Sequence, residues 1–122
     1  MTIPLSSDPL IDFDYLKSLV GSDEIKGNEL LVDIGGTFQE EIVKMRDAIL
    51  DAIQRKDAET LQKQTHKLSG GASSVGLRRL AGYAKNVENT IRAGESIDFE
   101  EVKGVIEPLI EDTCAAFSEL MG

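Results

Sequence analysis

The sequence predicts an all-α protein: an antiparallel up-down-up-down four-helix bundle with an additional short N-terminal helix. Four segments carry apolar residues at alternating three- and four-residue steps, the spacing of a helix with one buried face. The chain has no Trp and few aromatic residues, and its abundance of Leu, Ile, Ala, Glu and Lys favours helices over strands. Short connections make successive helices antiparallel, so their four apolar faces meet in one core.

Length and charge limit the class of protein. At 122 residues the chain has room for one domain, which we expect to span residues 1–122. The net charge of -9, without any basic block, argues against binding to nucleic acid or to an anionic membrane. Neither a signal peptide nor an apolar run of about 20 residues occurs, so no membrane insertion is expected. The single cysteine, Cys114, cannot form an internal disulfide, and we expect a cytoplasmic protein.

The N-terminal part is expected to hold a short helix behind a loose lead-in, residues 1–7. Asp8 followed by Pro9 is typical of an N-cap and the first turn of a helix. This helix should run to about Val20 and stop at Gly21, because glycine favours the left-handed conformation at a helix C-terminus.

The second segment is predicted to be a long amphipathic helix capped by Ser22 and Asp23. Its apolar positions are Leu31, Ile34, Phe38, Ile42, Met45, Ile49 and Ile53. Gly35 and Gly36 interrupt this pattern and indicate either close helix packing or a bend.

The three remaining helices follow from the same signals. Asp57 caps the third and Gly76 stops it, while the fourth ends at Gly94 and Asp98 caps the last. Their apolar rows are Leu61, Thr65, Leu68, Ala72 and Val75; Leu77, Leu80, Ala84, Val87 and Ile91; and Phe99, Val102, Ile106, Leu109, Phe117 and Leu120. Pro108 lies inside the last helix, where a kink is expected rather than a break.

His66, in the third helix, is the candidate for chemistry. At 100° per residue it lies roughly 140° from the apolar row, on the exposed face. Gly70 follows one turn later and leaves the imidazole uncovered. Gly70 and Gly71 each cost about 1 kcal/mol relative to alanine inside a helix, so a compensating gain is expected, such as close approach of another molecule.

The residues around His66 suit a negatively charged group. Lys63 and Lys67 flank it on an otherwise acidic chain, and Ser69 and Ser73 place hydroxyl groups on the same side. An exposed imidazole is also partly neutral and nucleophilic near neutral pH. A lone exposed histidine is more often an ordinary solvated residue, so the neighbouring glycine pair is what favours a reactive role.

The run THKLSGGASSVGL resembles the signature of histidine-containing phosphotransfer (HPt) domains. In that signature the phosphorylated histidine is followed by an apolar residue, a glycine and a second glycine, here His66, Leu68, Gly70 and Gly76. The following run, AGYAKNVENTIRAGE, looks like the family's next helix, with Glu88 and Arg92 in familiar places, and Pro108 also fits. One departure is Ser69, which stands where the family usually has lysine.

The resemblance implies a phosphoryl carrier in a multistep two-component phosphorelay. His66 would be phosphorylated on Nε2 and would pass the group between aspartates of receiver domains. The immediate docking and phosphate-stabilising rim would be Lys63, Lys67, Ser69, Gly70 and Ser73. The partners implied are receiver domains of response regulators or of a hybrid sensor histidine kinase. We expect a monomer without a metal or cofactor of its own, with Mg²⁺ held by the partner receiver domain.

Other classes of function predict different features of the chain. A docking adaptor for receiver domains would keep the bundle and tolerate replacement of His66. A di-iron bundle needs inward-facing Glu-x-x-His pairs, whereas this chain has one outward-facing histidine. An autonomous kinase or phosphatase is not expected, because the sequence has no Gly-rich nucleotide loop and no second catalytic group is expected beside His66.

Overall fold

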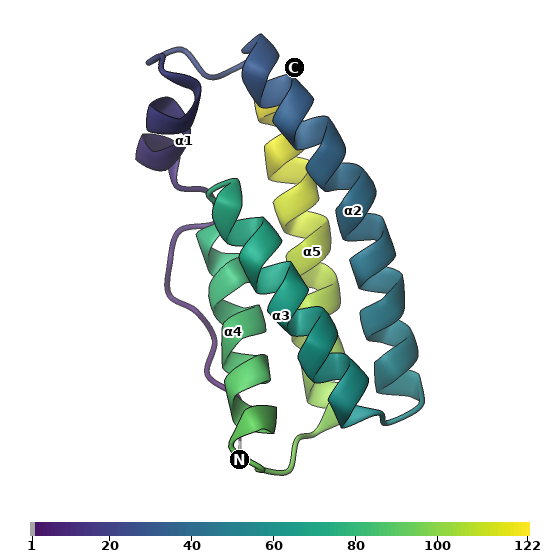
Figure 1. Ribbon diagram of the computed structural model, residues 1–122. Helices are drawn as coiled ribbons and strands as arrows, with labels where there is room; N and C mark the ends of the chain where they lie inside the picture. Colours follow the sequence, from purple (N-terminus) through teal and green to yellow (C-terminus); the bar gives the residue numbers. More distant parts are fainter. Residues whose placement is uncertain (1) are drawn as a thin grey trace.

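The computed structural model describes residues 2–122 and contains five helices (Figure 1). They are α1 (Phe13–Val20), α2 (Glu29–Gln54), α3 (Ala58–Ser74), α4 (Arg78–Arg92) and α5 (Phe99–Met121). Helices α2 to α5 run alternately up and down, and α1 lies at one end of this bundle. The predicted all-α four-helix bundle with a short first helix is therefore confirmed. Within residues 2–122, none of the helices combines the length and apolar character needed to cross a membrane.

The core lies between one face of each long helix, as the apolar periodicity predicts. Helix α3 packs most extensively against α4, and α2 packs against both α3 and α5. Fully or nearly fully buried members of the predicted rows are Leu31, Phe38, Ile42, Ile49, Ile53, Leu61, Thr65, Leu68, Ala72, Val75, Leu77, Leu80, Ala84, Val87, Val102, Ile106 and Phe117. The rows of α2 and α5 meet at Phe38 and Phe117, whose rings make an edge-to-face contact with centroids 6.5 Å apart.

Several helix ends are where the sequence predicts them. The carboxylate of Asp57 accepts a hydrogen bond from the backbone N–H of Thr60, and that of Asp98 accepts from two backbone N–H groups of α5. Gly76 has a φ of 74°, and this left-handed conformation turns the chain directly from α3 into α4. Helix α5 continues through Pro108 to Met121, so the proline does not break it.

The prediction for the N-terminal segment is wrong in two respects. Asp12, not Asp8, caps α1, by accepting a hydrogen bond from the backbone N–H of Tyr15 at 3.0 Å. The predicted lead-in is not loose at Ile3, which is buried and whose N–H donates to Glu101 of α5 at 3.1 Å. Met1 lies outside the described residues. The segment runs along α4, where the Asn86 amide donates to a backbone carbonyl of the segment at 2.8 Å (Figure 1).

The start of the long helix also differs from the prediction. Ser22 and Asp23 lie in a loop, and Asn28 caps α2 by accepting hydrogen bonds from the first N–H groups of the helix. The physical reason is the buried side chain of Ile25 and the left-handed Gly27, whose N–H donates to a carbonyl at the end of α5 at 2.7 Å. The loop is thereby held on the bundle before the helix can begin.

The adjacent glycines of α2 have different roles. A Cβ at Gly35 would overlap the side chains of Phe117 and Met121, so this glycine permits close packing of α2 on α5. A Cβ at Gly36 would meet no atom within 4 Å. Close packing therefore explains the first glycine and not the second.

These two glycines give a matched prediction for stability. We expect Gly35→Ala to lower the free energy of unfolding by about 1–3 kcal/mol, because Phe117 must move. Gly36→Ala should raise it by about 0.5–1 kcal/mol, because alanine loses less backbone entropy in a helix. Urea unfolding followed by circular dichroism measures both values. Equal changes of the same sign would contradict the close packing of α2 on α5.

Candidate functional site

The imidazole of His66 projects from the exposed face of α3. Its side chain is 66% exposed, although Thr65, the residue before it, is fully buried. Within residues 2–122, a Cβ at Gly70, one turn later, would meet no atom within 4 Å, so the space beside that turn is open. The ring is therefore accessible to another molecule.

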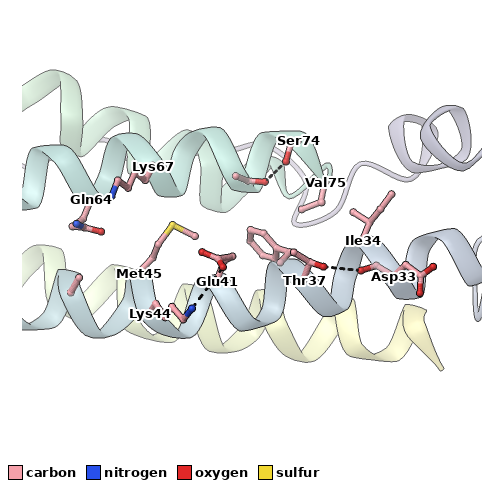
Figure 2. A pocket seen from close by; sticks show the side chains of 13 residues that line it. Asp33, Ile34, Thr37, Glu41, Lys44, Met45, Gln64, Lys67, Ser74 and Val75 are labelled. Carbon is pink, nitrogen blue, oxygen red and sulfur yellow. Dashed lines mark hydrogen bonds and ion pairs between the residues drawn. The ribbon is translucent and has the colours of Figure 1, made fainter.

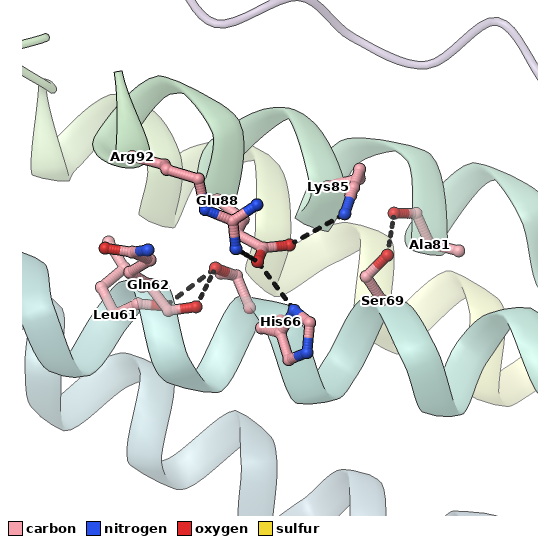
Figure 3. A network of polar contacts seen from close by, with 9 residues as sticks. Leu61, Gln62, His66, Ser69, Ala81, Lys85, Glu88 and Arg92 are labelled. Carbon is pink, nitrogen blue, oxygen red and sulfur yellow. Dashed lines mark hydrogen bonds and ion pairs between the residues drawn. The ribbon is translucent and has the colours of Figure 1, made fainter. Parts of the chain in front are cut away.

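Glu88 of α4 holds the inner nitrogen of this ring. Its side chain is fully buried, and one carboxylate oxygen, Oε2, lies 2.7 Å from His66 Nδ1 (Figure 3). Burial by itself raises the pKa of Glu88, but the hydrogen bond with His66 and the positive charges of Arg92 and Lys85 outweigh it. The net effect is a pKa below the usual value, so Glu88 is an ionised hydrogen-bond acceptor at neutral pH.

Because Glu88 is ionised, only one tautomer of the neutral His66 ring can form this hydrogen bond. An ionised carboxylate can only accept hydrogen bonds, so Nδ1 carries the proton that it donates to Glu88. In the neutral ring the lone pair is then on Nε2. Because the two nitrogens face different directions, Nε2 points away from the buried carboxylate (Figure 3). The arrangement presents a nucleophilic nitrogen to the outside of the bundle.

Two basic side chains of α4 complete a polar cluster around Glu88. Arg92 donates through Nη2 to Oε2, the oxygen that also accepts from His66, and Lys85 Nζ lies 3.4 Å from Oε1. Lys85 and Arg92 are one turn before and one turn after Glu88, so all three share a face of the helix. The cluster carries one more positive than negative charge, which favours binding of an anion.

A pocket of about 460 Å³ opens beside His66, on the side of Lys85. Ser69, Gly70 and Ser73 of the predicted rim line it. Ser69 does not point freely into this space, because its hydroxyl donates to the carbonyl of Ala81 at 3.1 Å and so links α3 to α4. The structure thus brings three of the five predicted rim residues together with His66.

The other two rim residues, Lys63 and Lys67, lie on the opposite side of His66. They line a smaller pocket, of about 390 Å³, with His66 and Arg92. Lys63 forms an exposed ion pair with Glu59, at 3.4 Å, within α3. Lys67 also borders a larger groove between α2 and α3, so its side chain lies on the α2 side of the helix.

The groove between α2 and α3 has a volume of about 900 Å³ (Figure 2). Phe38 and Met45 of α2 form much of its floor, beneath Gly71 of α3. A Cβ on Gly71 would lie 3.6 Å from the Phe38 ring, which is an ordinary contact. The two adjacent glycines therefore face different surfaces, since Gly70 faces open space beside His66 and Gly71 faces this groove.

The cluster of Glu88, Lys85 and Arg92 was missed by reasoning from the residues alone. Only the resemblance to the HPt family drew attention to Glu88 and Arg92, and the direct contact of Glu88 with the ring was not predicted. A signal was present, since Glu88 lies four residues after Ala84 and three before Ile91, on the apolar row of α4. An acidic residue at a core position with basic residues one turn on either side indicates a buried, paired carboxylate. Within residues 2–122 no group of His, Cys, Asp and Glu side chains is placed to hold a metal ion.

Comparison with known proteins identifies the family. The sequence model of the Hpt domain matches residues 33–119, well over half of the chain. The crystal structure of histidine-containing phosphotransfer protein B (HptB) from Pseudomonas aeruginosa PAO1 matches 94% of this chain and 96% of its own, with a TM-score of 0.72 and 26% sequence identity. No curated protein sequence matches. The chain therefore belongs to the Hpt domain family, the histidine-containing phosphotransfer domains of phosphorelays.

Proposed function

We propose that His66 is the phosphoryl carrier of this Hpt domain and moves the group between aspartates of receiver domains. The observation that carries the proposal is the exposed imidazole whose Nδ1 is held by Glu88 at 2.7 Å. The partners are receiver domains of response regulators, of a hybrid sensor histidine kinase, or of both. One histidine per chain suffices for this role. We further propose that the protein acts as a monomer and in the cytoplasm, together with its partners.

The transfer itself requires little from this chain. The lone pair of Nε2 attacks the phosphorus of a phosphoaspartate, the N–P bond forms, and the P–O bond to the aspartate breaks. The carboxylate leaves with the bonding electrons, so it needs no proton. The reverse reaction with a second receiver domain regenerates the free imidazole. Mg²⁺ held by the receiver domain would neutralise charge on the phosphoryl oxygens, so we propose no metal site in this chain.

Glu88 acts as a positioning residue in this proposal. The ring becomes positively charged when Nε2 bonds to phosphorus, while Nδ1 keeps its proton. The carboxylate 2.7 Å from Nδ1 stabilises that charge and holds the ring in one orientation. Because Glu88 is itself buried in the packed surface of α4, it does not have to be ordered during the reaction.

Gly70 gives the receiver domain room to approach. The active aspartate of a partner must come within bonding distance of Nε2, so the partner's loops must lie close to α3. The open space at Gly70 is next to the ring, and any larger side chain there would project into the path of approach. This function offsets the conformational cost of a glycine in the middle of a helix.

The first test is phosphoryl transfer from a phosphorylated receiver domain. The protein should acquire acid-labile, alkali-stable phosphate, and His66→Gln should acquire none. Circular dichroism of the variant should show an intact bundle, because residue 66 is exposed. If several competent receiver domains bind the protein but label neither form, the protein is a docking adaptor and the proposal fails.

Enlarging Gly70 should block the partner more than the chemistry. We expect Gly70→Gln to reduce the rate of transfer from a receiver domain about tenfold or more, by steric exclusion. Chemical labelling by phosphoramidate, a small phosphoryl donor, should change much less. Gly36→Gln is the matched control, since it places the same side chain at another open position of a helix. Equal losses with both donors would argue against a docking role for Gly70.

Removing the Glu88 carboxylate should slow transfer and release the ring. We expect Glu88→Ala to lower the transfer rate by about 10- to 100-fold, by analogy with the loss of a hydrogen-bond partner that orients a metal-binding histidine. Glu88→Gln, whose carbonyl can still accept from Nδ1–H, should lose less. The ¹⁵N chemical shifts of the imidazole separate this role from a merely structural one, since only a positioning residue controls the tautomer. An unchanged tautomer in the alanine variant would refute it.

A further inference from the structure

The phosphorylated form of His66 needs a cation that the Nδ1 contact does not provide. A phosphoryl group on Nε2 adds up to two negative charges to a chain whose net charge is already -9. Position 69, three residues after the histidine, is a serine whose hydroxyl is engaged with Ala81. This inference rests on the proposed function and asks which side chain stabilises the group once it is bound.

Five cationic side chains line the two pockets that border His66. Arg78 and Lys85 line the pocket on the Ser69 side, and Lys63, Lys67 and Arg92 line the other. They differ in how firmly hydrogen bonds and ion pairs hold each side chain in place. This difference indicates which of them can contact a phosphoryl group on His66.

Arg78 is held away from the ring. Its Nε donates to Asp12 at 3.1 Å, its guanidinium stacks on the Tyr15 ring at 4.6 Å, and its Nη1 donates to the carbonyl of Ser73. These contacts join α1 to the turn between α3 and α4. Movement of Arg78 toward a phosphoryl group would break this junction, so its role is structural.

The lysines of α3 are also poorly placed. Lys63 lies almost one turn before His66 and pairs with Glu59 at 3.4 Å. Lys67 follows His66 directly, so it points about 100° away around the helix axis, toward the groove with α2. A lysine can bend, but both side chains start on the side of the ring away from Ser69.

Arg92 helps to hold His66 in its orientation. It donates to Glu88 Oε2, the oxygen that accepts the Nδ1 proton. If Arg92 moved to the phosphoryl group, Glu88 Oε2 would lose the positive charge that is paired with it. This loss would come when the phosphorylated imidazole is itself charged and depends on the carboxylate. Figure 3 shows Arg92 on the side of Gln62, across the ring from Ser69.

Lys85 is held by fewer contacts than Arg78 and, unlike the lysines of α3, lies on the Ser69 side of the ring. Its Nζ contacts the other carboxylate oxygen, Oε1, at 3.4 Å, which is a weak interaction, and its side chain is 49% exposed. It lies on the Ser69 side of His66, in the same pocket (Figure 3). Because Ser69 is short and hydrogen-bonded to α4, it leaves this space open to the flexible lysine.

We propose that Lys85 is the cation that holds the phosphoryl group on His66. When the group is bound, Nζ leaves Oε1 of Glu88 and contacts a phosphoryl oxygen, while Arg92 keeps Glu88 paired. Lys85 exchanges a long contact with the buried Glu88 for a contact with a group of higher charge, while His66 and Arg92 keep Oε2 of Glu88 paired. Asp8 lines the same pocket, so Lys85 also offsets a negative charge of this chain beside the phosphoryl group.

The first test measures the pKa of the phosphoryl group on His66. The protein is phosphorylated on His66 with phosphoramidate; the P–N bond of the reagent breaks, ammonia leaves and the bond to Nε2 forms. The ³¹P signal is then titrated with pH. Lys85→Gln should raise the phosphoryl pKa, because the nearby positive charge favours the dianion. Lys85→Arg should restore most of the wild-type pKa, whereas Lys63→Gln and Lys67→Gln should leave it unchanged.

Transfer kinetics provide the second readout. We expect Lys85→Gln to reduce the rate of transfer from a phosphorylated receiver domain about tenfold, which corresponds to about 1.4 kcal/mol. The imidazole tautomer should stay as in the wild type, because Glu88 remains paired with Arg92. An unchanged phosphoryl pKa in Lys85→Gln, an equal shift in Lys67→Gln, or no chemical labelling of His66 would each overturn the proposal.

Failure of the relay function gives a different result. If receiver domains do not label the wild-type protein but the phosphoryl pKa of the chemically labelled protein still depends on Lys85, the assignment of Lys85 holds and the relay function fails. If receiver domains label the wild-type protein and the phosphoryl pKa does not depend on Lys85, the relay function holds and the assignment of Lys85 fails.

Discussion

The site depends on one buried carboxylate, that of Glu88, at the contact between α3 and α4. A buried carboxylate is costly unless it is paired and hydrogen-bonded, and three donors from His66, Lys85 and Arg92 satisfy it. All three donors have exposed side chains, so they bring the charge of the cluster to the surface. The same carboxylate that needs these partners thereby fixes the inner nitrogen of His66 and leaves the outer one free.

The rest of the fold keeps α3 and α4 in register around that carboxylate. Thr65, next to His66, turns its buried hydroxyl back to the carbonyl of Leu61 at 2.8 Å, so the inner face of α3 presents no unsatisfied group to the core. At the other end of the helix pair, the α1 cap residue Asp12 pairs with Arg78 of α4 at 3.1 Å, and its N–H donates to the carbonyl of Gly76. Helix α1 and its cap residue therefore hold the turn between α3 and α4 in place from outside the four-helix core.

The four amphipathic helices could be predicted from the sequence because each has a regular apolar row, and several helix ends followed from local signals such as Asp57. Asp12 and Asn28 were missed as caps because tertiary contacts delay the start of their helices. The residues before α1 and α2 are held on the bundle, as the burial of Ile3 and Ile25 shows. The exposure of His66 followed from helical spacing. Its contact with Glu88 did not, because it joins residues of two helices and depends on how α3 and α4 are rotated against each other.

The composition of α3 reflects two opposing demands: the helix must pack stably in the bundle, and it must present a polar, accessible surface around His66. Its buried row is thin, consisting of Leu61, Thr65, Leu68 and Ala72, and the glycine pair weakens its intrinsic helicity. Such a helix would be marginal alone, so it depends on extensive packing against α4. Because packing against α4 supplies this stability, most of the surface of α3 can remain polar and accessible to a partner. Stability is supplied mainly by the larger apolar side chains of its neighbours, and α3 is left free to present His66.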